Sequence, residues 1–189
     1  MEIVDIFSDF LVIDYIDIPL ENIKKHCVQV SKSDSGRSVS NQNGYQSNFI
    51  DLGNKNILEL VSIIENKLIQ IGQHIGMNQN CKYKITEMWV NINRYTNYNM
   101  PHTHAGLFSG VFYVEGNNAD LVLINQDNLK ASKIDENYVG NYSKYLASYW
   151  NINPEPNKLV IFPSWINHYV QPNLSKLPRI SLSFNAVVL

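Results

Sequence analysis

The segment WVNINRYTNYNMPHTHAGLFSGVFYV, residues 89–114, carries the strongest structural signal in the chain. Around its central polar turn, β-branched and aromatic side chains alternate with other residues, which is the two-residue period of a β-strand. Many short strands separated by polar turns favour a sandwich or jelly roll over β-α-β units. Similar short runs continue to the C-terminus, so we predict strands over 83–95, 107–115, 120–124, 158–162, 169–172 and 179–188.

The residues before position 80 have a different periodicity. Between positions 54 and 75, apolar residues recur at three- and four-residue steps, which predicts an amphipathic helix. A shorter helix is predicted over 19–30, because Pro19 suits a first helical turn. The stretch between the two helices, residues 31–48, is rich in Ser, Asn and Gly and is predicted to be a loop that could act as a lid.

We expect residues 1–189 to form a single domain, mainly β with N-terminal helices. Residues 1–80 would provide a helical support and loop, and residues 81–189 would form the jelly-roll core. Residues 125–157 are rich in Asn, Tyr and Lys and have no clear period, so we expect a long insertion that could overhang a site.

Composition disfavours several classes of partner. The chain has 15 Lys and Arg against 17 Asp and Glu, and no basic cluster exceeds two consecutive residues, which disfavours nucleic acid as a partner. No apolar run approaches the roughly 18 residues of a membrane span, and the acidic N-terminus is not a secretory signal. Cys27 and Cys81 lack the spacing of a zinc or redox motif. A cytoplasmic location, that of a host cell if the protein is viral, is the expectation.

Three histidines of the β-rich half could form a metal site. They occur as Pro-His-Thr-His at 101–104 and as the last residue of Trp-Ile-Asn-His at 165–168. In an extended chain His102 and His104 lie on one face, roughly 7 Å apart. A jelly roll can bring His168 beside them. Imidazole suits iron, zinc, copper or nickel, and three protein ligands leave coordination positions open, although a lone histidine near a strand end is more often structural.

Arg179 and Ser181 share one face of the last predicted strand. An arginine on an interior strand face is costly unless an anion pairs with it. An arginine fork with a neighbouring hydroxyl is therefore a candidate carboxylate receptor. A salt bridge to an acid of the chain is the structural alternative.

Two further strands present polar side chains whose faces the sequence leaves open. Trp89, Asn91, Asn93 and Tyr95 alternate along one strand, so they share a face. They would contact cosubstrate or substrate if that face is interior, and would otherwise be packing and edge groups. In the next strand Ser109, Val111 and Tyr113 face one way and Gly110, Phe112 and Val114 the other, with the inward set undetermined.

Taken together, these motifs resemble the 2-oxoglutarate and Fe(II)-dependent oxygenase superfamily. Its pattern is His-x-Asp/Glu, a distal His, and Arg-x-Ser about ten residues later. More narrowly, residues 89–114 with LVIFPSWINHYVQPN (159–173) and RISLSFN (179–185) resemble a small subgroup of oxygenases common in phages and marine bacteria. GYQSN at 44–48 also resembles that subgroup, so the likeness covers most of the chain.

The resemblance implies a double-stranded β-helix of the cupin-like jelly-roll type, with His102 and His168 as iron ligands. It implies that Arg179 and Ser181 bind the distal carboxylate of 2-oxoglutarate while the keto-acid end chelates Fe(II). A phenol reaching this carboxylate is common in the superfamily, which makes Tyr113 a candidate. With O2, the cosubstrate would become succinate and CO2 as a prime substrate is oxidised.

The sequence departs from the superfamily at His104, where most members have Asp or Glu. His104 could itself be the second ligand, in a three-histidine site one positive charge higher than the usual one. Alternatively, a carboxylate such as Asp120 could complete the site with His104 beside it. A halide-holding vacancy fits poorly, since halogenating relatives carry a small residue there.

Three functions follow from these observations. The first is an oxygenase, most simply a hydroxylase, acting on an unidentified substrate such as a protein side chain or a small metabolite. The second is a cupin-like enzyme with a three-histidine zinc site. The third is a non-enzymatic jelly-roll structural protein of a virus. A homodimer is conceivable, because exposed sheet edges are often covered by a second copy.

Overall fold

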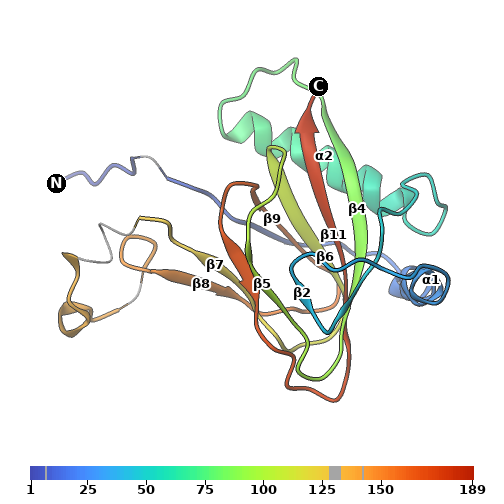
Figure 1. Cartoon of the computed structure of the whole chain (residues 1–189). Helices are drawn as coiled ribbons and strands as arrows, with labels where there is room; N and C mark the ends of the chain where they lie inside the picture. Colours follow the sequence, from blue (N-terminus) through green and yellow to red (C-terminus); the bar gives the residue numbers. More distant parts are fainter. Residues whose placement is uncertain (7, 128–132, 142) are drawn as a thin grey trace.

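The computed structural model describes residues 1–6, 8–127, 133–141 and 143–189, and these form two facing antiparallel sheets (Figure 1). The six-stranded sheet has the order β1 (Val12–Tyr15), β9 (Lys158–Pro163), β6 (Phe108–Glu115), β11 (Arg179–Val188), β4 (Tyr83–Asn93) and β3 (Tyr45–Gln46). The five-stranded sheet has the order β2 (Asn41–Gln42), β5 (Tyr98–His102), β10 (His168–Val170), β7 (Leu121–Ile124) and β8 (Tyr149–Ile152). The mainly β class predicted from the sequence is confirmed.

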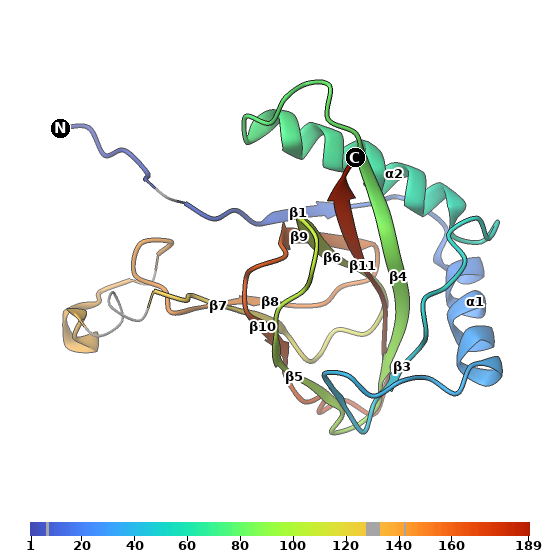
Figure 2. The ribbon, with the colours of Figure 1, turned by 45° about the horizontal axis from the view of Figure 1, so that its top comes forward.

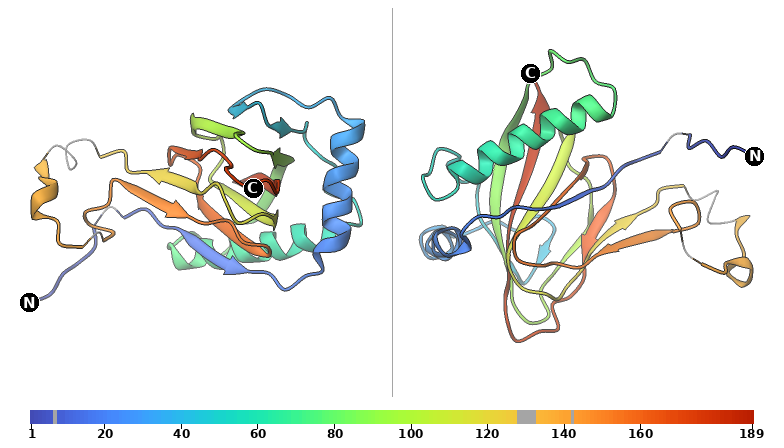
Figure 3. Two further views of the ribbon diagram at one scale, coloured as in Figure 1. Left: turned by 90° about the horizontal axis from the view of Figure 1, so that it is seen from below. Right: turned by 180° about the vertical axis from the view of Figure 1, so that it is seen from behind.

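Two helices, α1 (Leu20–Ser33) and α2 (Leu58–His74), pack against the outer face of the six-stranded sheet (Figures 2 and 3). Both were predicted. Pro19 precedes the first helix, whose N-terminal end matches the prediction, whereas the second begins four residues later than predicted because residues 54–57 form a turn. A short 3-10 helix, η1, spans Glu136–Tyr138. No helix of the described chain has the length and apolar character needed to cross a membrane.

Strand alternation divides the molecule into two cores. On β6, Phe108, Phe112 and Val114 join the helices in the outer core. Val111 and Tyr113 join the core between the sheets, which settles the orientation that the sequence left open. The same alternation on β11 directs Ile180, Leu182 and Phe184 outward and Arg179, Ser181 and Ser183 inward. Arg179 and Ser181, which were predicted to share one face of the last strand, therefore both face the space between the sheets.

Three details correct the sequence prediction. Tyr95 lies in the turn after β4 and is 61% exposed, so it does not extend the inward row of that strand. Strand β5 was not predicted, because its residues lack apolar alternation. Residues 125–157 contain β8, which pairs with β7 in a hairpin that projects from the sheets (Figure 1), while residues 128–132 and 142 lie outside the described part.

Candidate metal centre

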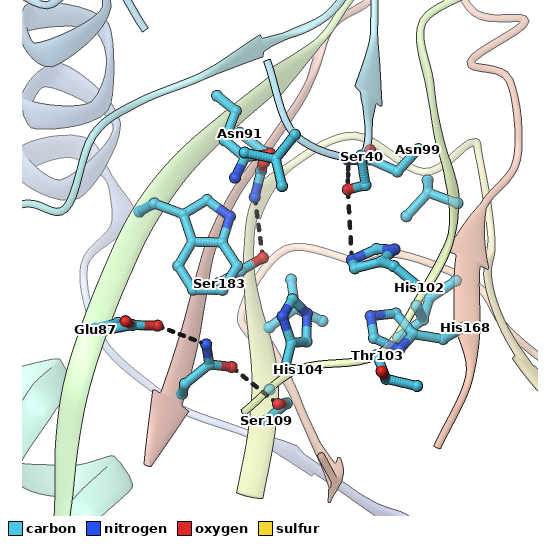
Figure 4. A pocket seen from close by; sticks show the side chains of 18 of the residues that line it. Ser40, Glu87, Asn91, Asn99, His102, Thr103, His104, Ser109, His168 and Ser183 are labelled. Carbon is cyan, nitrogen blue, oxygen red and sulfur yellow. Dashed lines mark hydrogen bonds between the residues drawn. The ribbon is translucent and has the colours of Figure 1, made fainter. Parts of the chain in front are cut away.

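The three predicted histidines converge between the sheets. His102 ends β5 and pairs in register with His168, the first residue of β10. His104 follows two residues later, where its backbone N–H donates to the Ser164 carbonyl at 3.0 Å. The three rings point toward one another (Figure 4), with centroids 4.4 to 5.0 Å apart. One nitrogen from each ring lies within 4.8 Å of the others, which is close enough for a shared metal ion.

Backbone carbonyls fix which nitrogen faces the centre. His102 Nδ1 donates to the Met100 carbonyl at 2.7 Å, and His168 Nδ1 donates to the Ile166 carbonyl at 2.9 Å. Each Nε2 is then left as the metal-binding atom, as in most histidine metal sites.

Burial keeps these imidazoles neutral. Desolvation, with a smaller contribution from the neighbouring His102, lowers the pKa of His168 to about 3 and that of His104 to about 4. Desolvation also lowers the pKa of His102. A neutral imidazole is the form that binds metal, so the three donors are ready for an ion at neutral pH.

The donor set consists of nitrogen alone. In the described chain the only cluster of metal-binding side chains contains these three histidines and no carboxylate. Asp120, the alternative ligand, lies outside this cluster and accepts a hydrogen bond from Asn153 Nδ2 at 3.2 Å. The geometry therefore favours His104 over Asp120 as the third ligand, and three imidazoles fit Fe(II) as well as zinc, copper or nickel.

A cavity of about 300 Å³ adjoins the histidines and contains a buried cation. Arg179 lines this cavity and is 3% exposed. Its Nη1 donates to the Ala119 carbonyl at 3.2 Å, and its guanidinium carbon lies 5.9 Å from the centre of the Tyr113 ring. It makes no salt bridge within the described residues, so the structural alternative of an acidic partner is not borne out there. Such a cation is costly to bury unless a ligand supplies the anion.

Next to Arg179 lies a row of polar groups without partners. Ser181 pairs in register with Asn91 on one side and Tyr113 on the other, so the three side chains cross the sheet side by side. Ser181 Oγ, Asn91 Oδ1, Tyr113 Oη and Arg179 Nε are all buried without a hydrogen-bond partner among the described residues. Buried polar atoms are normally satisfied, so this row fits a polar ligand.

Tyr113 keeps its proton in this row, because desolvation raises its pKa to about 12 despite the nearby guanidinium. The phenol is therefore a hydrogen-bond donor. Gly116 brings the chain close to the arginine: its φ is +104°, and a Cβ there would lie 2.9 Å from the Arg179 Cα. Only glycine combines this φ with this approach, so the turn after β6 packs directly on the arginine backbone.

Two predicted residues lie beside the cavity rather than on it. Asn93 and Ser181 are not among its lining residues. The Asn93 amide donates to Asn99 Oδ1 at 3.2 Å, and Asn99 donates to Ser40 Oγ at 3.1 Å. Ser40 Oγ lies 3.4 Å from His102 Nε2. Asn93 is therefore connected to the metal centre through two other side chains.

Sequence reasoning missed much of the cavity wall. The described residues of the 125–157 insertion do not line it, contrary to the expected overhang, because their hairpin projects away. The predicted loop 31–48 and its neighbour Phe49 supply one wall instead, through Arg37, Val39, Ser40, Gln46 and Phe49. Glu87 also lines the cavity, where it accepts a hydrogen bond from Asn185 Nδ2 at 2.8 Å. The period of β4 could have identified Glu87, since it lies two residues before Trp89.

Two facing antiparallel sheets with three convergent histidines and a buried arginine between them are the architecture of a jelly-roll protein with a candidate metal site. Comparison with known protein families shows which family within this class the chain belongs to. The family model described as "Putative 2OG-Fe(II) oxygenase" matches residues 87–185. The chain therefore belongs to this family of 2-oxoglutarate-dependent dioxygenases, which are oxidoreductases that use Fe(II), 2-oxoglutarate and O2.

Solved structures confirm the double-stranded β-helix. A prolyl-4-hydroxylase of Pseudomonas putida is 14% identical with a TM-score of 0.65, and the match covers 94% of this chain and 93% of that one. The viral collagen prolyl hydroxylase of Paramecium Bursaria Chlorella virus-1, in complex with 2-oxoglutarate, is 13% identical with a TM-score of 0.58, over 92% and 94%. The epimerase SnoN from nogalamycin biosynthesis is 8% identical with a TM-score of 0.69, over 95% and 78%. No match was found among the curated proteins.

Proposed function

We propose that this oxygenase is a hydroxylase in which His102, His104 and His168 hold Fe(II) and Arg179 holds the distal carboxylate of 2-oxoglutarate. The observation that carries the proposal is the guanidinium of Arg179, buried without a salt bridge among the described residues, in the same cavity as three convergent imidazoles. A metal beside a fixed cation matches a ligand that is a chelator at one end and a carboxylate at the other.

The neighbouring residues complete the binding of the cosubstrate. The Tyr113 phenol donates a hydrogen bond to the same carboxylate, and Ser181, its neighbour in register on β11, lies beside it. Asn91 presents an unpaired Oδ1 toward the cavity while its Nδ2 donates to Ser183 Oγ at 2.9 Å. Asn93 acts as a positioning residue through Asn99. When bound, Fe(II) and 2-oxoglutarate supply the activation of O2 for oxidation of a C–H bond.

Hydroxylation is favoured over other outcomes by the structural neighbours. Two of the three neighbours reported above are prolyl hydroxylases, and both match this chain over nearly their whole length. The third is an epimerase that depends on α-ketoglutarate, so the fold also supports other oxidative outcomes. An amino-acid side chain is accordingly the first class of substrate to test.

The direct experiment measures succinate formed from 2-oxoglutarate by the protein with Fe(II) and O2. We expect turnover by the wild-type protein and its loss in His168→Ala, whose buried imidazole is removed from the metal centre. The matched control is His74→Ala at the exposed end of α2, which should retain activity. Absence of succinate from the wild-type protein, or equal activity of the two variants, would contradict the proposed function.

Three imidazoles without a carboxylate also specifically suit Zn(II), so a zinc enzyme is the second candidate. Metal analysis after anaerobic purification separates the two. A zinc enzyme would retain zinc and would turn over without 2-oxoglutarate. Substitution of Arg179 would then leave its activity unchanged, whereas the oxygenase would lose activity.

A further inference from the structure

The cavity contains a second arginine, Arg37, on the segment between α1 and β2. Its backbone N–H donates to the Gln46 carbonyl at 2.8 Å, which fixes the segment against β3. Its guanidinium lies 4.1 Å from the centre of the Phe49 ring and 5.8 Å from that of Trp89. These cation–π contacts hold the guanidinium at the wall of the cavity that contains the three histidines.

Arg37 makes no salt bridge in the described part of the chain, although its charge contributes to lowering the pKa of Asp34. Its side chain also makes no hydrogen bond there, and its Nε is buried without a partner. Asp34 is the nearest acid along the chain, but its carboxylate accepts hydrogen bonds from the backbone of Gly36 and from Asn48. A guanidinium offers five donors, so Arg37 has unused capacity for an anion.

Glu87 is the only acidic residue among the described residues that line the cavity, and it makes no salt bridge with Arg37 there. Its carboxylate instead accepts a hydrogen bond from Asn185 Nδ2 at 2.8 Å.

We propose that Arg37 binds a carboxylate of the prime substrate. This inference rests on the proposed function, because it takes the prime substrate to be the compound oxidised at the histidine centre. Trp89 connects the two places: its ring lies 5.8 Å from the Arg37 guanidinium carbon and 5.5 Å from the His104 ring. A substrate whose carboxylate contacts Arg37 therefore extends across the indole ring of Trp89, and the carbon that is oxidised lies at the histidine centre.

The size and rim of the cavity agree with a small acid. About 300 Å³ is at the lower end of small-molecule sites, and the cosubstrate takes part of it. Val39 and Phe49, beside Arg37 in the lining, are 64% and 49% exposed, so this wall forms the mouth. An entering carboxylate meets Arg37 before its carbon reaches the histidines. The substrate class is thus a carboxylic acid of about amino-acid size.

The test compares acids with their uncharged amides, which differ in charge but hardly in shape. The protein is loaded with Zn(II), which has no redox chemistry, and with saturating 2-oxoglutarate, so that Arg179 is occupied. N-acetyl amino acids and their primary amides are then titrated and binding is followed by NMR. The proteins are the wild type, Arg37→Met, Arg37→Lys and the control Arg94→Met, whose exposed side chain does not line the cavity.

We expect at least one acid to bind wild type and Arg94→Met at least about tenfold more tightly than its amide, which corresponds to about 1.4 kcal/mol. Arg37→Met should reduce this preference to about twofold or less. Arg37→Lys keeps the positive charge but lacks the paired N–H donors of the guanidinium, so it should show an intermediate preference. This variant still tests the role of Arg37 if the Met variant does not fold.

Two results would overturn the inference: no acid binds more tightly than its amide, or the preference persists in the Arg37 variants. Binding of 2-oxoglutarate in the same wild-type samples separates this failure from that of the proposed function. If 2-oxoglutarate binds and the acids show no preference, only the role of Arg37 is wrong. If 2-oxoglutarate itself does not bind, the proposed function is wrong.

Discussion

Replacement of Arg179 by Met should stabilise the ligand-free protein and weaken its binding of 2-oxoglutarate. Arg179 is 3% exposed, its Nε has no partner, and its one hydrogen bond is to the Ala119 carbonyl at 3.2 Å. Loss of that bond costs about 1 kcal/mol. The desolvation of the unpaired guanidinium costs several kcal/mol, and Met fills a similar volume without it. We therefore expect the free energy of unfolding to rise by about 1 to 3 kcal/mol.

The effect on binding has the opposite sign. Removal of an arginine that makes two charge-assisted hydrogen bonds to a buried carboxylate costs about 3 to 5 kcal/mol of binding free energy. At 1.4 kcal/mol for each factor of ten, the dissociation constant for 2-oxoglutarate should rise at least about a hundredfold. The structural reason is that Arg179 precedes Ser181 by two residues on the same face of β11, so its guanidinium is the cation next to the row of Ser181, Asn91 and Tyr113.

Two measurements on the same variants check this pair of effects. Calorimetric titration of 2-oxoglutarate into Zn(II)-loaded protein gives the binding constant, and thermal unfolding of the metal-free protein gives Tm. For a domain of this size, 1 kcal/mol shifts Tm by about 2 to 4 °C, so Arg179→Met should unfold at least about 2 °C higher than wild type. Arg94→Met is the control. Binding within about threefold of wild type, or a lower Tm, would refute the assignment of Arg179 as an anion receptor.

Three further predictions concern stability and reactivity. Gly110→Ala should lower the free energy of unfolding by about 1 to 3 kcal/mol in a urea titration, because its methyl group would lie 2.6 Å from a backbone oxygen of β9. Unchanged stability would contradict this and would mean that the two strands move apart to accommodate the methyl group. Zn(II) at a hundredfold excess over its Kd should stabilise the wild-type protein by about 2.7 kcal/mol and so raise its Tm, and His168→Ala should lose this rise. Cys81, which is partly exposed, should react with iodoacetamide in the folded protein at pH 9, whereas Cys27 should not, because burial raises its pKa to about 12. Mass spectrometry of the modified peptides checks this, and faster labelling of Cys27 than of Cys81 would contradict it.

Local periodicity was enough to predict β4, β6, β9 and β11 of the six-stranded sheet, but not its short strands β1 and β3. Strand β11 begins and ends where the alternation predicts, at Arg179 and Val188. The period-2 rule also places Arg179 and Ser181 on one face and His102 beside His104. The assignment to the phage and marine subgroup stays a prediction.

Contacts between distant segments decided what the sequence left open. The orientation of β6 depends on which face meets the helices, and only the packed structure shows Phe108 and Phe112 against them. Strand β5 forms because β2 and β10 pair with it, and not because its own residues favour a strand. The sequence did not identify Arg37 as a site residue, because it stands in a loop of Ser and Asn residues. Its position at the cavity depends on contacts with Phe49 and Trp89, which are twelve and fifty-two positions away.

The neutral third ligand and the second arginine are physically related. The cavity-lining residues Arg37, Arg179 and Glu87 together carry one net positive charge, and three neutral imidazoles leave both charges of a divalent ion uncompensated. The two carboxylates of 2-oxoglutarate offset only part of this excess. A carboxylate at position 104 would reduce it further and would weaken the field that attracts an anionic substrate. If His104 is the third ligand, we expect the site to select acids more strongly than a two-histidine, one-carboxylate site would, because an anionic substrate would offset the remaining positive charge.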